Sequence, residues 1–323
     1  MRRVSRLAAL VAALLIWPAA LFAGEAHWPA TLTIGTASPG GTYYAYGEGL
    51  AKILTQKLRL PVVSRATDGP NQNIQLLESG EVQIAFVTLG AAQQAWNGTA
   101  PWTAGKPLRS MRAMFPMYDT PFQFMTLQES GIQKLADLKG RRVGVGPETG
   151  TAGTYVPQVF RTLGIEATLV HGEWANLAAQ VQGGTLDALA VAAGVPFPSF
   201  TELERKSRVR FLTLSPSQIV DLRLAIPELG LSLVPAGLYP SLSQRYVTIG
   251  LYNFAVAHSS LPDDLVYAIV AAVFSEHERM MEIHSAAGET VPANFVRNTF
   301  LPFHNGASRW YRNQAVLGTV GTD

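Results

Sequence analysis

The sequence predicts an α/β protein with two lobes that face each other across a cleft. A strand, a glycine-rich turn and a helix follow one another near residue 40, and the same order recurs near residue 150. Two long predicted strands, at 118–127 and 245–258, would cross from one lobe to the other. Since ligands of parallel sheets bind beyond the carboxyl ends of the strands, we expect a ligand cleft between the lobes.

The first strand–turn–helix unit spans residues 31–58. Leu32, Thr33 and Ile34 alternate as in a short strand, and the run Ser38-Pro39-Gly40-Gly41 then breaks the chain. Apolar residues recur after the break at three- and four-residue steps, which predicts a helix. A helix that begins at such a turn presents free N–H groups to an anion, but the turn is equally consistent with a plain connection.

The rest of the first lobe continues the alternation of strands and helices. We expect strands at 61–64 and 82–87, and helices at 71–79 and 90–96. The strand at 82–87 is almost entirely apolar, as is typical of a buried parallel strand. Thr67 and Thr88 follow the two strands and would therefore lie at the cleft.

The second lobe repeats this order. We expect strands at 122–127, 142–145, 167–171 and 186–193, and helices at 132–138, 156–163 and 174–182. The polar turn 146–154 enters the helix that carries Val156 and Phe160. The chain then returns through the strand 245–258 to one long helix at 262–284 and a last helical piece at 303–315.

Composition excludes several classes of function. Without Arg2, Arg3, Arg6 and Glu25 of the first 26 residues, the 25 basic and 23 acidic residues of the 323-residue chain become 22 of each. This balance leaves no basic excess for nucleic acid. The chain has no cysteine and its six histidines form no metal motif, so we expect neither a metal site nor a cofactor. Gly144, Gly146 and Gly150 are spaced one residue wider than a dinucleotide fingerprint.

The N-terminus has the layout of a secretory signal peptide. Three arginines precede an uncharged run, Leu7 to Gly24, and small residues follow it. A retained membrane anchor is the alternative, because 18 uncharged residues are borderline for spanning. We predict that residues 1–26 are a signal peptide, that cleavage falls between Gly24 and His27, and that the protein is periplasmic.

Five segments, taken in order, resemble the TAXI-type solute-binding proteins of TRAP (tripartite ATP-independent periplasmic) transporters. The segment 40–47, GGTYYAYG, is similar to the family's G-G-x-Y-Y-x-x-G. The segments 76–82 (LLESGEV), 149–151 (TGT), 262–267 (PDDLVY) and 304–311 (HNGASRWY) are similar to four further family motifs. The match covers nearly the whole exported chain. One departure is Asp68-Gly69-Pro70, where the family has G-G-S, and another is Thr88-Leu89-Gly90, where it often has Ser or Asp.

The resemblance implies a type II periplasmic-binding-protein fold with two crossing strands. Lobe I would comprise residues 30–121 and 253–323, and lobe II residues 122–252. The resemblance also implies a monomer that captures a small carboxylate, such as a glutamate-like amino acid or another organic acid, and delivers it to membrane carrier subunits. The alternative is an enzyme on the same scaffold, of the thiamine-precursor type, although the sequence supplies no evident catalytic group for it.

The expected site lies at the two Gly/Thr turns, whose N–H groups and hydroxyls would bind a carboxylate without an arginine. Arg65 is the nearest candidate for a positive charge. Tyr43, Tyr44 and Trp174 would cover the apolar part of the ligand. The predicted ligand-binding residues are Ser38, Gly40, Gly41, Thr42, Tyr43, Tyr44, Thr67, Asn71, Thr88, Thr149, Gly150, Thr151, Thr154, Trp174 and Pro196.

Overall fold

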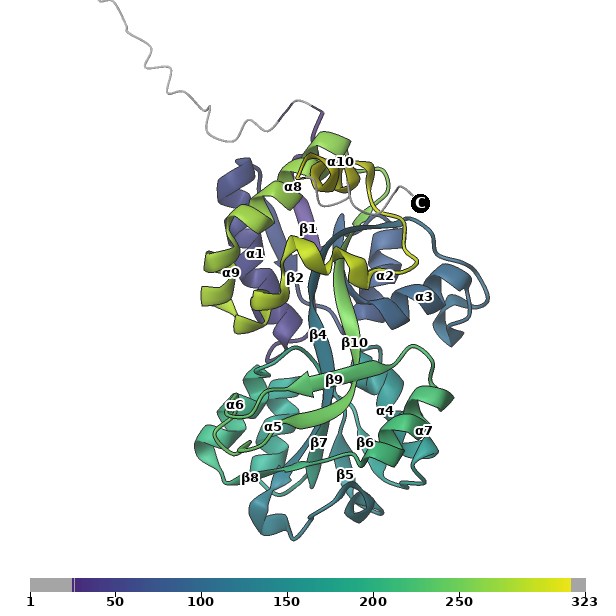
Figure 1. The fold of residues 1–323 in the computed structure, drawn as a ribbon, viewed down its shortest axis with the longest axis vertical. Helices are drawn as coiled ribbons and strands as arrows, with labels where there is room; N and C mark the ends of the chain where they lie inside the picture. Colours follow the sequence, from purple (N-terminus) through teal and green to yellow (C-terminus); the bar gives the residue numbers. More distant parts are fainter. Residues whose placement is uncertain (1–24, 26, 315–323) are drawn as a thin grey trace, which may run out of the picture.

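Two α/β lobes lie one above the other and are joined by two long strands, β4 (Met111–Leu127) and β10 (Tyr246–His258) (Figure 1). The computed structural model describes residue 25 and residues 27–314, so the predicted signal peptide falls outside the described residues except for Glu25. The predicted two-lobed α/β fold is confirmed. Within the described part of the chain, no helix has the length and apolar character needed to cross a membrane.

The sheet of lobe I has the strand order β2-β1-β3-β10-β4. Its parallel strands are β1 (Leu32–Gly35), β2 (Val62–Arg65) and β3 (Ile84–Thr88), and β10 joins β3 in the antiparallel sense. All five residues of β3 are buried. Since successive side chains point to opposite faces, Ile84 and Phe86 pack in one apolar cluster while Ala85 and Val87 pack in another.

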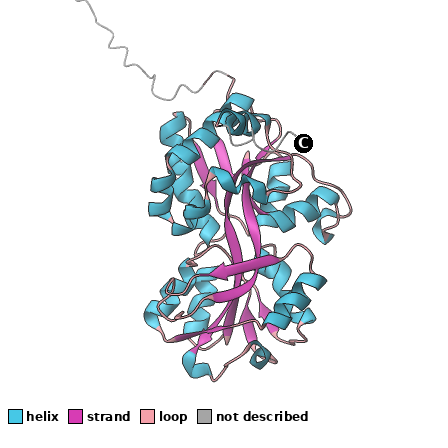
Figure 2. Cartoon of the chain, in the orientation of Figure 1, coloured by secondary structure: helices cyan, strands magenta, loops and turns pink. Residues whose placement is uncertain are grey.

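Helices cover both faces of this sheet (Figure 2). The helices of lobe I are α1 (Thr42–Leu58), α2 (Pro70–Glu78), α3 (Leu89–Asn97), α8 (Asp263–Ser275), α9 (His277–Ile283) and α10 (Asn305–Asn313). Short 3-10 helices are η1 (Pro101–Thr103), η4 (Ser285–Glu289) and η5 (Pro292–Arg297).

The prediction of a single helix at 262–284 is wrong. The chain turns at Glu276, whose φ and ψ of −107° and 22° leave the helical region. The turn lets α9 pack on α1, where Ile283 lies against Gly49 so closely that a Cβ there would be 2.3 Å from its Cδ1 atom. Packing of α9 against α1 therefore divides the helix in two, although the helical pattern of residues 262–284 is continuous in the sequence.

Lobe II repeats the layered arrangement around a second sheet. Its strands are β5 (Arg142–Gly144), β6 (Thr168–Val170), β7 (Ala188–Ala192), β8 (Val209–Leu212) and β9 (Gly230–Val234). Its helices are α4 (Thr151–Thr162), α5 (Trp174–Gln182), α6 (Pro198–Lys206) and α7 (Pro216–Ala225), with 3-10 turns η2 (Gln128–Ser130) and η3 (Leu135–Leu138). β7 and β8 pair with the lower half of β4, and β9 pairs with the lower half of β10.

A buried amide joins the two crossing strands where they pass between the lobes, a region here called the hinge. Asn253 of β10 is fully buried, and its Nδ2 donates to the Tyr118 carbonyl of β4 at 2.6 Å and to the Thr120 hydroxyl. Its Oδ1 accepts from the Tyr43 hydroxyl of α1 at 2.6 Å. One side chain thus links β4, β10 and the helix that begins at the cleft.

We predict that Asn253→Ala lowers the free energy of unfolding by about 1–3 kcal/mol, because it removes the partners of buried polar groups. Urea unfolding followed by circular dichroism measures the change. Asn97→Ala, at the exposed end of α3, is the matched control and should leave stability nearly unchanged. Equal effects of the two substitutions would contradict this role of Asn253.

Candidate functional site

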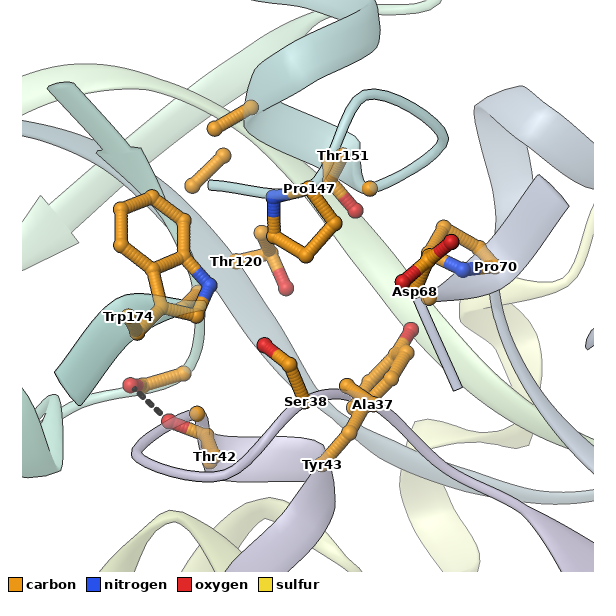
Figure 3. Close-up of a pocket in the computed structure, with 17 residues that line it drawn as sticks. Ala37, Ser38, Thr42, Tyr43, Asp68, Pro70, Thr120, Pro147, Thr151 and Trp174 are labelled. Carbon is orange, nitrogen blue, oxygen red and sulfur yellow. Dashed lines mark hydrogen bonds between the residues drawn. The ribbon is translucent and has the colours of Figure 1, made fainter. Parts of the chain in front are cut away.

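A cavity of about 40 Å³, here named the cleft cavity, lies between the lobes where four helices begin (Figure 3). Its wall is formed by Ala37, Ser38, Gly41, Thr42, Tyr43, Asp68, Gly69, Pro70, Thr120, Pro147, Gly150, Thr151, Ala152, Trp174, Ala192, Ala193 and Gly194. An engineered cavity of about 150 Å³ holds benzene. The cleft cavity in this arrangement of the lobes is therefore smaller than a space known to hold one small organic molecule.

Of the four helices that start at this wall, α1, α2 and α4 have a glycine as the N-cap residue, whereas α5 begins at Trp174. These N-cap glycines are Gly41, Gly69 and Gly150, which have no side chain to accept from the first turn. The first-turn N–H groups and the positive ends of the helix dipoles therefore favour an anion here. By contrast, Thr88 accepts from the Ala91 N–H and satisfies the start of α3 itself.

Hydroxyl and indole groups supply further donors. Ser38 is 4% exposed, and its hydroxyl has no hydrogen-bond partner among the described residues. In Figure 3 this hydroxyl points toward the indole of Trp174, and the Thr120 hydroxyl faces the same space. A buried donor without a partner is costly. A ligand oxygen placed here would accept from it.

Packing fixes the position of Trp174. Its ring lies edge-on to Phe197, with centroids 5.2 Å apart and an angle of 83° between the planes. Gly146 has a φ of +73°, and a Cβ at this position would be 2.3 Å from the Trp174 Cζ2 atom. Only glycine therefore fits beneath the indole, and the indole forms a firm wall of the cleft cavity.

The wall of the cleft cavity contains one negatively charged side chain. Asp68 is the one acidic residue in the wall, and the wall has no lysine, arginine or histidine. Burial raises the pKa of Tyr43 well above its usual value, so this hydroxyl stays neutral and donates to Asn253. The cavity thus offers neutral donors on most sides and one carboxylate at its edge, where Asp68 is exposed.

Hydrogen bonds hold the lobes together around the cleft cavity. The Thr42 hydroxyl of lobe I donates to the Gly194 carbonyl of lobe II at 2.7 Å. The Asn71 amide donates to the Thr154 hydroxyl at 3.0 Å. These contacts define a closed arrangement of the lobes.

A histidine and a serine add two further contacts between the lobes. His284 Nε2 donates to the Pro196 carbonyl at 3.0 Å, and its Nδ1 accepts from the Ala286 N–H. Burial lowers the pKa of His284, which keeps this ring neutral. The Ser199 hydroxyl donates to the Gly40 carbonyl at 3.0 Å.

Glycines allow the two backbones to meet. A Cβ on Gly69 of lobe I would be 3.1 Å from the Cα atom of Gly150 in lobe II. A Cβ on Gly40 would be 2.7 Å from Ser199 Oγ and 3.0 Å from the Ala175 nitrogen, both in lobe II. The contact between the lobes therefore depends on the absence of side chains at the turns.

The structure brings seven predicted site residues to the cavity wall: Ser38, Gly41, Thr42, Tyr43, Gly150, Thr151 and Trp174. Four others, Gly40, Asn71, Thr154 and Pro196, take part in contacts between the lobes. The remaining four lie away from the wall: Thr67 hydrogen-bonds Asn73, Thr88 caps α3, Thr149 has a buried hydroxyl, and Tyr44 is half-buried.

Arg65 does not supply a charge to the cleft cavity. Its guanidinium donates to Glu81 at 3.1 Å and is exposed on the outside of lobe I. The prediction also missed Thr120, Pro147 and the segment 192–194 as parts of the wall. Asp119 and Thr120 are the polar residues in an otherwise apolar part of β4. This break in the apolar pattern was the sequence signal that could have identified Thr120.

Comparisons with known proteins identify relatives of this fold. The sequence profile described as the NMT1-like family matches residues 34–314. The structure of MatC from Rhodopseudomonas palustris with bound malate has a TM-score of 0.59 and 14% identity, over 84% of this chain and 93% of that one. PhnD1 from Prochlorococcus marinus in complex with methylphosphonate has a TM-score of 0.55 and 13% identity, over 90% and 97%. A structure titled as a periplasmic transporter has a TM-score of 0.54 and 14% identity, over 90% and 96%.

We predict that Gly40→Ala shifts the protein toward an open arrangement, because the added Cβ meets Ser199 and Ala175 of the other lobe. Since the chain has no cysteine, spin labels on Lys52→Cys and Lys139→Cys report the distance between the lobes. The distance measured by pulsed electron resonance should increase.

Gly80→Ala is the matched control. Its φ of +78° imposes a similar backbone strain, but a Cβ there has no atom within 4 Å. The control should leave the distance between the lobes unchanged. If Gly40→Ala also leaves the distance between the lobes unchanged, the turn at Gly40 does not determine how far the lobes close.

Proposed function

The chain belongs to the NMT1-like family and has the two-lobed fold of periplasmic binding proteins, and from this we propose that it captures a small carboxylate for a membrane transporter. The observation that carries the proposal is the convergence of three helix starts with a glycine N-cap on the cleft cavity. A carboxylate bound there would accept hydrogen bonds from backbone N–H groups of both lobes. Binding would then favour closure about β4 and β10.

The donors of the cavity wall support an anion as the ligand. The Ser38 hydroxyl is buried and has no partner among the described residues, and the N-caps of α1 and α4 have no side chain to satisfy the first turn. Two of the fold neighbours were solved with small anions, malate and methylphosphonate. These neighbours are 13% and 14% identical to this chain, so the identity of their ligands is not carried over to it. The class of ligand, a small anion, agrees with the hydrogen-bond donors in the wall of the cleft cavity.

Asp68 favours an acid that also carries an ammonium group. Its carboxylate is the only acidic group in the wall, and no basic residue of the wall faces it. It would attract the ammonium group of an amino acid and repel a second carboxylate at the same place. We therefore place an amino acid, such as a glutamate-like one, ahead of a dicarboxylic acid.

The transporter that we propose is of the TRAP type, on the resemblance of five ordered segments to TAXI-type binding proteins. The protein would then act outside the cytoplasm and deliver its ligand to membrane carrier subunits. An enzyme on the same scaffold is the competing function. It would need a nucleophile or an acid–base pair in the cleft, whereas the wall supplies neutral hydroxyls and a single carboxylate at its edge.

A thermal-shift screen over amino acids and organic acids tests the proposal. A ligand that binds only the folded state adds about 2.7 kcal/mol of stability at ~100 times its Kd. Native mass spectrometry after incubation should then show the acid bound and unchanged. Conversion of the acid to a product would favour the enzyme instead.

We predict that Thr151→Val weakens binding of the acid found in the screen. Thr151 begins α4 at the cavity wall, and valine keeps its shape but removes the hydroxyl. Loss of a hydrogen bond to a charged group costs about 1.5–3 kcal/mol, or roughly ten- to a hundredfold in Kd. Calorimetry measures the change. Thr162→Val, exposed at the end of the same helix, is the control and should bind as tightly as the parent.

Asp68→Asn tests whether the ligand carries an ammonium group. An exposed ion pair contributes about 0.2–1 kcal/mol, so we predict an increase of the Kd of roughly 1.4- to fivefold for an amino acid ligand. The loss should shrink at high salt, because screening weakens the attraction. Asp221→Asn, exposed on α7, is the control. Tighter binding by the Asp68 variant would mean that the ligand has no cationic group near this carboxylate.

A further inference from the structure

A second and larger cavity lies on the opposite face of the hinge. Asp119 and Thr120 are neighbours on β4, so their side chains point to opposite faces of the strand. Thr120 lines the cleft cavity, whereas Asp119 lines a cavity of about 520 Å³, here named the hinge cavity. β9, which borders the hinge cavity, passes in front of β4 and β10 in Figure 1.

Both lobes contribute to the walls of the hinge cavity. Lobe I supplies Leu89 and Gln93 of α3 and Phe300 near the end of the chain, while lobe II supplies Glu228 and Leu231. The residues 250–252 of β10 lie between these walls. The width of the hinge cavity therefore depends on the angle between the lobes.

The charge of the hinge cavity is predominantly negative. Three carboxylates line it, those of Asp119, Glu228 and Glu289, against one guanidinium, that of Arg297. None of the three carboxylates belongs to an ion pair among the described residues. Arg297 instead lies over the ring of Tyr252, 5.4 Å from its centroid.

Two of these carboxylates are compensated only in part, because burial raises the pKa of both whereas the charge of Arg297 lowers it. Asp119 accepts from the Ser232 hydroxyl and from the Thr120 N–H. Among the described residues, the Glu289 carboxylate accepts from the Asp119 N–H alone, at 3.3 Å. Burial, and then the charge of Asp119, raise the pKa of Glu289 to about 7. Burial also raises the pKa of Asp119. A positive charge placed between the two groups would relieve this cost.

We propose that the hinge cavity is a second binding site, which takes an organic cation with a short apolar stem. Asp119 and Glu289 would accept from its ammonium group, and the walls formed by Leu231, Leu251 and Phe300 would contact the stem. Its volume lies within the range of small-molecule sites, about 300–1,000 Å³. The site uses none of the residues that line the cleft cavity.

The two cavities are coupled through the hinge. The two cavities lie on opposite faces of β4 and β10. A rotation of the lobes about these strands that closes the cleft cavity therefore widens the hinge cavity. A cation in the hinge cavity therefore favours the closed arrangement of the lobes. By linkage, a ligand that closes the cleft must favour binding of the cation to the same extent.

Calorimetry with n-butylammonium chloride tests the site directly, without knowledge of the cleft ligand. We expect saturable binding at pH 8 and weaker binding at pH 6, because Glu289 takes up a proton as the pH falls through its pKa. The charged and titratable groups that face Glu289 are Asp119 of β4, Tyr252 of β10 and Arg297 of η5. Sodium butyrate and n-butanol, which have the same stem without the positive charge, should not bind.

Glu289→Gln should weaken binding of n-butylammonium at pH 8 at least tenfold and remove most of the pH dependence. Glu282→Gln, on the exposed side of α9, is the matched control and should bind like the parent. Absence of saturable binding at both pH values would overturn the proposal. Equal Kd values for the parent and Glu289→Gln would overturn it as well.

The spin-label pair at positions 52 and 139 tests the coupling. n-Butylammonium should shift the distance distribution toward shorter values, and the same salt should have no effect on Glu289→Gln. A distribution that stays unchanged at saturation would contradict the coupling of the two cavities. Because neither test involves the acid of the cleft cavity, failure here and failure of the proposed function are distinguishable.

Discussion

The close approach of bare backbone across the cleft is the constraint on which the site depends. Gly69 of one lobe faces Gly150 of the other so closely that a Cβ would nearly touch the opposing Cα atom. Each of these glycines is also the N-cap of a helix and therefore leaves the first turn uncapped. The same residue type thus permits closure and supplies the free N–H groups that an anion needs.

The segments that resemble TAXI-type proteins act mainly in packing. In the segment 40–47, Tyr43 binds Asn253 at the hinge, and Gly47 lets α1 approach the residue that follows β1, since a Cβ there would be 2.3 Å from Thr36 Cγ2. In the segment 304–311, Gly306 lies against α8, where a Cβ would be 2.0 Å from the Asp263 carbonyl oxygen. The segments 40–47 and 149–151 also supply the helix starts in the cavity wall, to which Asp68 and Thr120, outside the motifs, add two polar side chains.

Sequence periodicity predicted the alternating strands and helices because burial of β3, β7 and α1 leaves a strong apolar pattern. It did not predict α6, β8, α7 and β9, although Ser215 and Gln218 form a capping box with Pro216 at the first helical position. Residues of both Gly/Thr turns lie in the wall of the cleft cavity, and their role in binding stays a prediction. The contribution of Thr120 was missed although Asp119 and Thr120 interrupt the apolar run of β4, because the position at which β4 crosses between the lobes is set by tertiary packing.

Hydrogen–deuterium exchange with the acid identified by screening tests the central claim most directly, because it reports on backbone N–H groups. We expect slower exchange at the starts of α1 and α4, residues 42–44 and 151–153, when the acid is saturating. Exchange in the exposed helix α7 should stay unchanged. Protection confined to other segments, with no change at either helix start, would contradict binding of the acid by the N–H groups of both lobes.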